Sequence, residues 1–261
     1  MGSTTDGGAA GGPDGPDGLA GLPLPADSVG LLEGVTTTRA IRRYLPEPVP
    51  ESVLRAILFA ATRAPSGSNR QPFRFVVLRD GPNARAAKSL IGRNARRGWG
   101  TKRAADDYDR GSGTQVGSTK ARLARTMEEY VERFESVPVL ILPCLLRYRP
   151  PVPTEGASIY PACQNLLLAA RALGYGGVLT GWHVGVEAEL RALLGVPDDA
   201  FMAATITLGR PEGHHGPVRR RPLSSLVFEE DWAQAPAWAV DPPDVQHTSA
   251  GPPRYRAERG L

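Results

Sequence analysis

Helix-period and strand-period hydrophobic segments alternate along the central part of this chain, but at irregular intervals. A helical pattern at residues 51–63 is followed by an extended one at 73–78, and the next buried extended segment comes only at 137–146. A parallel α/β sheet needs strands that are separated by crossover helices at a repeated spacing. The irregular order therefore predicts an α+β fold.

Proline and glycine mark the ends of most segments, because a proline disfavours helical backbone in the residue before it and a glycine often ends a helix. The expected helices are residues 51–63, 119–135 and 161–174, and a stretch around Leu190 to Leu194. The expected strands are residues 73–78, 137–146, 177–180 and 201–208.

Residues 92–127 are the least regular stretch, basic and interrupted by glycine. Long irregular stretches inside a domain are often functional. We therefore interpret the part that precedes the expected helix at 119–135 as a lid over a site, with Trp99 and Tyr108 as its aromatic side chains. A plain surface excursion is the alternative.

The two ends of the chain differ from its centre. The first 30 residues are rich in glycine and proline and poor in large apolar groups, which predicts a disordered leader. From residue 234 onward proline is dense again, and Trp238 and Tyr255 could anchor an extended arm. The predicted organisation is a leader at 1–30, a folded domain at 31–233 and a proline-rich arm at 234–261.

Charge and composition exclude several classes of protein. No run approaches the roughly 18 apolar residues of a membrane-spanning helix. The 31 basic and 27 acidic residues form no block of like charge, so we expect no nucleic-acid partner. Cys144 and Cys163 are too few for a disulfide framework or a zinc site, and no metal is expected. The first residues lack the pattern of a signal peptide, so we expect a cytoplasmic protein.

Common catalytic motifs are also missing. There is no G-x-G-x-x-G after a strand, no phosphate-binding G-x-x-x-x-G-K-[ST], no H-E-x-x-H and no G-x-S-x-G. His214 and His215 lie in G-H-H-G, a turn sequence, and we interpret them as two solvated loop histidines.

Two arginine groups and one polar loop remain as candidates for binding. T-T-T-R-A-I-R-R-Y carries Arg39 and Arg42, which a helical turn would bring to one side. P-V-R-R-R-P-L carries Arg219 and Arg220, and A-P-S-G-S-N-R-Q-P offers backbone amides and short polar side chains. Arginine donors suit phosphate well. Together these groups predict a flat, phosphorylated ligand with hydrogen-bonding edges.

Four segments in this order resemble the FMN-dependent nitroreductase family. They are R-A-I-R-R-Y-L-P-E-P-V-P, R-A-P-S-G-S-N-R-Q-P-F-R-F-V-V, A-S-I-Y-P-A-C-Q-N-L-L-L-A-A-R-A-L-G-Y-G, and T-L-G-R-P-E-G followed by V-R-R-R-P-L. The similarity covers about residues 36–228. It implies a central, mainly antiparallel sheet flanked by helices, and a homodimer with FMN at the interface.

The resemblance also implies the cofactor site, residue by residue. The implied FMN-binding residues are Thr38, Arg39, Ala40, Ile41, Arg42, Pro65, Ser66, Gly67, Asn69, Leu179, Thr180, Gly181, Arg219 and Arg220. Within them, residues 38–42 match the family's R-R-S-x-R, and residues 65–69 match a loop that reaches the flavin from the partner subunit. Thr38 and Ala40 depart from that motif, which has arginine and serine at these positions. Arg219 and Arg220 match its C-terminal phosphate site, where extra charge would compensate.

In this family a nicotinamide, NADH or NADPH, reduces the flavin, and an acceptor then takes its place in ping-pong turnover. The implied activity is the reduction of nitroaromatic or quinone-like acceptors, with Arg42 as the catalytic cation and with Trp182 and His183 as candidate acceptor-pocket residues. Alternatives are a specialised flavoenzyme of the same fold, acting as a dehydrogenase, oxidase or dehalogenase or fragmenting the flavin, and a flavin-binding protein without activity.

Overall fold

The computed structural model describes residues 23–248 and divides the chain into two compact units, which meet between His215 and Gly216. Most of the predicted leader, residues 1–22, and the end of the predicted arm, residues 249–261 with Tyr255, lie outside the described residues. Among the helices that are described, none has the length and apolar character needed to cross a membrane.

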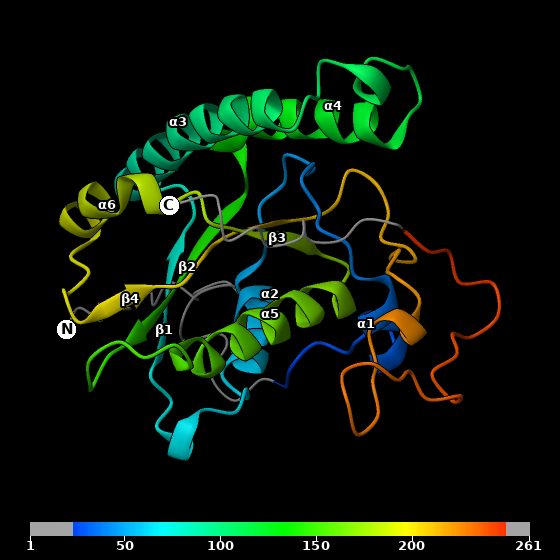
Figure 1. Cartoon of the computed structure of the whole chain (residues 1–261). Helices are drawn as coiled ribbons and strands as arrows, with labels where there is room; N and C mark the ends of the chain where they lie inside the picture. Colours follow the sequence, from blue (N-terminus) through cyan, green and yellow to red (C-terminus); the bar gives the residue numbers. More distant parts are fainter. Residues whose placement is uncertain (1–22, 249–261) are drawn as a thin grey trace, which may run out of the picture. The chain divides into compact units, whose positions relative to one another are not determined.

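A five-stranded sheet forms the centre of the first unit (Figure 1). Its strands are β1 (Phe73–Leu78), β2 (Val139–Leu146), β3 (Gly176–Thr180), β4 (Ala200–Met202) and β5 (Thr205–Gly209). The strand order is β1-β2-β5-β3, with β4 also paired to β2, and every pairing is antiparallel. The α+β class and the antiparallel sheet are thus confirmed.

The strand predicted at residues 201–208 is two strands, β4 and β5. β2 pairs with β5 through residues 139–141 and with β4 through residues 144–146. Pro143 lies between these two stretches, where its missing N–H leaves no donor for a continuous ladder. Its carbonyl accepts the N–H of Ala203, in the break between β4 and β5, at 2.9 Å. The break is therefore a consequence of a proline in the central strand.

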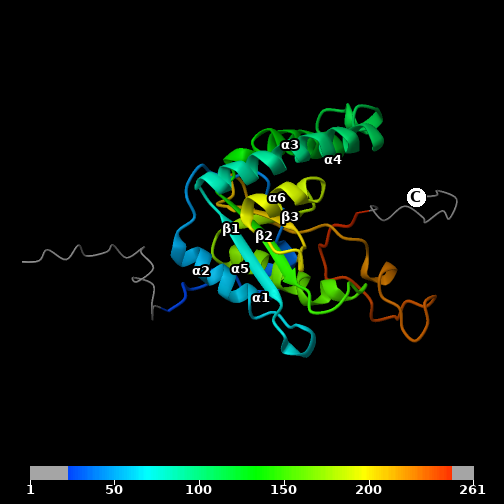
Figure 2. The ribbon, with the colours of Figure 1, turned by 90° about the vertical axis from the view of Figure 1, so that its left-hand side faces the viewer.

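Helices cover both faces of the sheet, as Figures 1 and 2 show. The helices are α1 (Leu31–Thr37), α2 (Glu51–Ala61), α3 (Pro82–Ala105), α4 (Thr119–Glu132), α5 (Tyr160–Ala172) and α6 (Glu187–Leu194). β2 alternates between two hydrophobic cores: Leu140 and Leu142 pack with α3, α4 and α6, whereas Val139 and Ile141 pack with α2 and α5. Burial on both faces explains why this strand reads as a continuous apolar run.

The first half of the stretch interpreted as a lid, residues 92–105, belongs to α3, which packs against α4. Trp99 and Tyr108 are buried with their ring centroids 5.1 Å apart, and the Trp99 indole N–H donates to Glu128 at 2.9 Å. Their interpretation as lid aromatics is therefore wrong, because they form the interior of the helical pair. The sequence did not predict α3 because its glycines have low helix propensity. A Cβ on Gly98 would lie 2.7 Å from the Trp182 ring, so close packing requires glycine there.

Candidate functional site

The first arginine segment runs extended along the edge of the sheet. α1 ends at Thr37, and the N–H of Ile41 donates to the carbonyl of Gly177 in β3 at 3.0 Å. The predicted helical turn that would align Arg39 with Arg42 is therefore wrong, because β3 offers this segment backbone partners. Ile41 is buried, Arg39 is exposed and Arg42 is half-buried.

Two successive glycines permit close approaches to β3: Gly176 that of the arginine segment, and Gly177 that of β5. A Cβ on Gly176 would lie 2.5 Å from Cγ1 of Ile41 and 2.8 Å from Nε2 of His215. A Cβ on Gly177 would lie 2.5 Å from the backbone oxygen of Thr207. All three distances are far below van der Waals contact. The position of the arginine segment therefore depends on Gly176 directly, and on Gly177 through the close pairing of β3 with β5.

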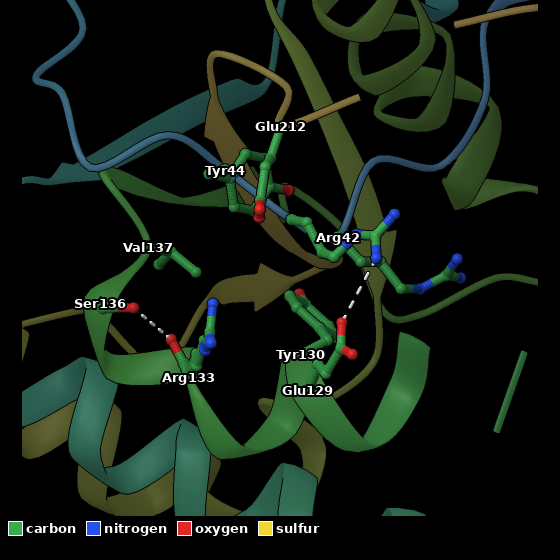
Figure 3. A pocket seen from close by; sticks show the side chains of 9 residues that line it. Arg42, Tyr44, Glu129, Tyr130, Arg133, Ser136, Val137 and Glu212 are labelled. Carbon is green, nitrogen blue, oxygen red and sulfur yellow. Dashed lines mark hydrogen bonds and ion pairs between the residues drawn. The ribbon is translucent and has the colours of Figure 1, made fainter. Parts of the chain in front are cut away.

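Arg42 carries a buried polar atom that is not satisfied. Its Nε is buried and has no hydrogen-bond partner among the described residues. It lines a small cavity together with Glu129 and Tyr130 (Figure 3), but Glu129 pairs with Arg43, at 3.5 Å. A buried donor without a partner costs about 1–3 kcal/mol. Arg42 is therefore suited to an acceptor that comes from outside the described chain.

The phenol groups of Tyr44 and Tyr130, near Arg42, are both hydrogen-bonded to Thr207. The Tyr44 hydroxyl donates to the carbonyl of Ile41 at 2.6 Å, and Oγ1 of Thr207 lies 2.8 Å from Tyr44 and 3.0 Å from the Tyr130 hydroxyl. Burial raises the pKa of Tyr130 to about 12 and the pKa of Tyr44 well above its ordinary value. Both phenols are neutral at physiological pH, so they do not neutralise the charge of Arg42.

The polar loop of Pro65, Ser66, Gly67 and Asn69 has an unusual backbone. Ser68, Asn69 and Gln71 have φ angles of 52°, 50° and 50°, in the left-handed region that favours glycine. The Gln71 N–H donates to Ser66 Oγ at 2.9 Å, and the Gly67 N–H donates to Ser158 Oγ at 3.1 Å. Such strain persists where the surroundings impose it and clusters at ligand-binding sites.

This loop and the arginine segment lie at opposite ends of the sheet. The loop precedes Phe73, which pairs with Leu145, whereas Gly177 pairs with Leu208, which in turn pairs with Val139. Six residues along β2 and three strand spacings separate the two places by roughly 25 Å. In Figures 1 and 2 the loop, in cyan, projects below the sheet, away from the blue segment that follows α1. One chain does not bring these predicted site residues together.

The third predicted group, Leu179, Thr180 and Gly181, lies at the end of β3, about 10 Å along the strand from Gly177. Leu179 is 39% exposed, and the Thr180 hydroxyl donates to the carbonyl of Thr205 at 3.3 Å. The strand thus places this group on the same edge as Ile41.

A side chain that the sequence did not point to holds the chain just after this group. Asn94 of α3 donates from Nδ2 to the carbonyl of Trp182 at 2.7 Å, whereas the buried Nε1 of Trp182 has no partner among the described residues. Asn94 lies in α3, the helix that was not predicted because of its glycines, and no sequence pattern near it indicated this contact.

His183 is a buried structural residue, not part of an open pocket. Its Nε2 lies 3.0 Å from the carbonyl of Met202 and its Nδ1 lies 3.1 Å from Oγ1 of Thr205. Because a carbonyl only accepts, Nε2 carries the proton and Nδ1 accepts from the threonine hydroxyl. The interpretation of His183 as an acceptor-pocket residue is therefore wrong.

His215 was expected to be a solvated loop residue, and this too is wrong. Its Nε2–H donates to the carbonyl of Tyr175 at 3.1 Å, and its Nδ1 accepts the backbone N–H of Arg39 at 3.3 Å. The neutral ring thereby joins the start of β3 to the arginine segment. The contact with Arg39 spans 176 positions of the chain, so no local pattern could reveal it.

The two histidines predict a loss of stability in acid. Burial lowers the pKa of both His183 and His215 below the ordinary value of about 6.5. The unfolded chain then binds more protons than the folded one, so their contribution is complete above about pH 6.5 and is lost as the pH falls toward the folded pKa values. We expect the urea midpoint to fall between about pH 7 and pH 5.

The control for this effect is a substitution of the exposed His214. Replacing His183 and His215 together by glutamine should flatten the pH dependence of the midpoint, whereas His214→Gln should preserve it. An unchanged slope in the double variant would contradict the assignment.

Arg219 and Arg220 belong to the second unit and are described within it. The Arg220 Nη1 donates to the carbonyl of Arg219 at 2.9 Å, and a bridge joins Arg220 to His247. Their predicted phosphate contact stays a prediction. Across residues 23–248, no group of three histidine, cysteine or acidic side chains is arranged to hold a metal ion.

An antiparallel sheet lies between two layers of helices, and Arg42 follows the residue that bonds to the edge strand β3. The protein is therefore of the α+β class, and its candidate site offers a buried Arg42 Nε that has no partner among the described residues. The model of the nitroreductase family matches residues 35–210, and the chain belongs to that family.

Three relatives show how far the similarity extends. The NADH dehydrogenase of Thermus thermophilus is 34% identical over 201 residues, which cover 73% of this chain and 91% of that protein. The 5,6-dimethylbenzimidazole synthase of Rhodospirillum rubrum is 27% identical, over 68% of this chain and 80% of its own length. A protein of Desulfovibrio desulfuricans, named as a nitroreductase and solved in complex with FMN, is 29% identical with a TM-score of 0.57, covering 77% of this chain and 96% of that one.

Proposed function

We propose that this protein is an FMN-dependent oxidoreductase that uses NAD(P)H to reduce nitroaromatic or quinone-like acceptors. The observation that carries the proposal is the buried Nε of Arg42, which has no partner among the described residues. Arg42 lies in the segment that resembles the family's R-R-S-x-R motif. The relative from Desulfovibrio desulfuricans was solved with FMN, and the relative from Thermus thermophilus is named as an NADH dehydrogenase, which supports both halves of the proposal.

The residues present fit a bound FMN. Arg42 offers a donor and a positive charge to the pyrimidine edge of the ring, and Leu179 with Gly181 offers an exposed strand end for the ring to lie against. The Thr38 hydroxyl donates to the carbonyl of Gly34 at 2.6 Å and is therefore committed to the end of α1. It does not replace the arginine that the family motif has at this position.

When bound, FMN would accept a hydride from NAD(P)H and pass the electrons to the acceptor. Arg42 would stabilise the negative charge that reduction places on the pyrimidine side. Because its position is fixed in advance by the Ile41–Gly177 bond and by packing beside Tyr130, no reorganisation is needed when the charge appears. The neutral phenols leave this positive charge in place.

We further propose that the active form is a homodimer in which the loop of residues 65–71 of one subunit completes the site of the other. The support is the separation of roughly 25 Å between this loop and the arginine segment of the same chain. Exposed apolar side chains offer a surface for a second copy: Leu31, Leu32 and Val35 on α1 are 74%, 79% and 50% exposed, and Phe59 on α2 is 48% exposed.

Steady-state oxidation of NADPH and NADH by the FMN-loaded protein tests this function. We expect turnover with a quinone or a nitroaromatic acceptor. A protein that binds FMN but turns over with neither donor would contradict the proposal and would favour the specialised chemistry for which the Rhodospirillum rubrum synthase is named.

Complementation tests the shared site with the same assay. Arg42→Ala removes the cation that one subunit contributes to the proposed site. Gly67→Trp places a bulky side chain in the exposed loop that the other subunit contributes. Each variant alone should be nearly inactive. Random pairing of the two chains gives heterodimers with one intact site each, so co-expression should restore about a quarter of the wild-type activity. No recovery would show that each chain forms its own site.

A further inference from the structure

A second cationic cavity lies beside the arginine segment, within the first unit. It has a volume of about 370 Å³, and its charged and titratable lining consists of Arg171, Arg210, His214 and His215. Of the described residues that line it, none is acidic. Two guanidinium groups on one concave surface are the donor set that proteins use for phosphate.

Arg171 has hydrogen-bonding capacity to spare. It lies in the last turn of α5, its side chain is only 17% exposed, and its buried Nε has no partner among the described residues. Its Nη2 lies 3.3 Å from Oγ1 of Thr37 and 3.5 Å from the carboxylate of Glu33, which is itself 62% exposed. The guanidinium is therefore held next to the segment that begins at Thr38.

Arginine side chains surround His215. After desolvation, the charges of Arg171 and Arg39 are what lower the pKa of this histidine. The imidazole is already committed on both nitrogens, to Tyr175 and to Arg39, and is kept neutral. Arg210 stacks over the Tyr175 ring at 4.9 Å and pairs with Glu47. The neutral ring of His215 thus lies beside these arginines in the cavity and adds no charge of its own.

We propose that this cavity binds the phosphate of the flavin mononucleotide, and that Arg171 supplies the charge that Thr38 does not. The inference rests on the proposed function. Three observations converge on it: Thr38 turns its hydroxyl back to Gly34, the Arg171 guanidinium contacts the neighbouring Thr37, and the Arg171 Nε lacks an acceptor. A phosphomonoester would satisfy that donor, in a cavity whose lining residue His215 accepts the backbone N–H of Arg39.

The test compares FMN with riboflavin, which has the same ring without the phosphate. The dissociation constants of both are measured on the apoprotein by quenching of flavin fluorescence. Wild-type protein should prefer FMN. Arg171→Gln should weaken FMN binding about 10- to 100-fold, the usual worth of a hydrogen bond to a charged group, and should leave riboflavin binding within about threefold.

Controls separate this role from folding and from the proposed function. Arg96→Gln removes another partly buried arginine, which lies on α3 and pairs with Glu135. This variant should change neither the FMN nor the riboflavin dissociation constant. Thr38→Arg in the Arg171→Gln background should restore the preference for FMN. Equal loss of FMN and riboflavin, unchanged FMN binding, or no rescue would each overturn the role of Arg171. Wild-type protein that binds neither flavin would instead overturn the proposed function.

The same cavity could be claimed for the phosphates of the nicotinamide. The dissociation constants of NADPH and NADH are therefore also measured, on the riboflavin-loaded protein. Weaker binding of NADPH alone in Arg171→Gln, with the FMN preference intact, would assign the cavity to the dinucleotide and contradict the proposal.

Discussion

Replacing Arg42 by alanine is expected to slow the reduction of bound FMN by NADPH about 100- to 1,000-fold, the usual effect of removing one preorganised donor from a developing negative charge. The reason is local. The Arg42 guanidinium lies near the neutral phenols of Tyr44 and Tyr130, and its buried Nε has no partner among the described residues, so its charge is available to a ligand. The rate is measured by stopped flow as the loss of flavin absorbance, at FMN concentrations that saturate both proteins.

The matched control is the adjacent residue. Arg43 is exposed and pairs with Glu129, so Arg43→Ala removes the same charge from the same segment without touching the unpaired donor. Its rate should stay within about threefold of wild type, since exposed ion pairs contribute little. Equal slowing in both variants would indicate a general electrostatic effect, and an unchanged rate in Arg42→Ala would remove the catalytic role of Arg42.

Gly177→Ala is expected to destabilise the fold by about 3 kcal/mol, at the upper end of what overpacking usually costs. The added Cβ would lie 2.5 Å from the backbone oxygen of Thr207, and a backbone atom inside a sheet cannot rotate away as a side chain can. Because Gly177 also accepts the N–H of Ile41, the shift should carry the arginine segment with it and weaken FMN binding.

Urea unfolding measures the first effect and flavin titration the second. Gly100→Ala is the control, because Gly100 lies in α3 with nothing within 4 Å of its added Cβ. That variant should be more stable by about 0.5–1 kcal/mol, the helix advantage of alanine over glycine. A Gly177→Ala protein as stable as wild type would contradict the close approach of β3 and β5 at Gly177.

The parts of the fold that local hydrophobic pattern determines could be predicted from the sequence. β1 was predicted at its observed bounds, and β2 and α5 were predicted to within two residues, because burial on one or two faces leaves a periodic signature. The pattern failed where distant packing decided the outcome. Gly92 and Gly98 of α3 face neighbouring side chains, and Pro143 in β2 leaves the break between β4 and β5 across the sheet.

The candidate site was predictable to a smaller extent. The residues of the arginine segment were found, but its extended form depends on Gly177, which lies 136 positions later in the chain. Asn94 was missed because it acts through one long-range contact and lies in no motif. Arg171 and His215 lie in segments that the sequence singled out, but their roles depend on contacts with Thr37, Arg39 and Tyr175 that no local pattern shows. In the proposed homodimer, the two halves of the site come from different copies of the chain, so they lie far apart in one sequence and in one fold. Only the resemblance to the family links them.

The central claim is that this chain holds FMN at the arginine segment and reduces it with a nicotinamide. Anaerobic addition of NADPH to the FMN-loaded protein, followed by visible absorbance, tests it most directly. We predict that stoichiometric NADPH bleaches the flavin band and that a quinone then restores it. A band that persists with both NADPH and NADH, or a protein that retains no FMN at saturating concentration, would contradict the account.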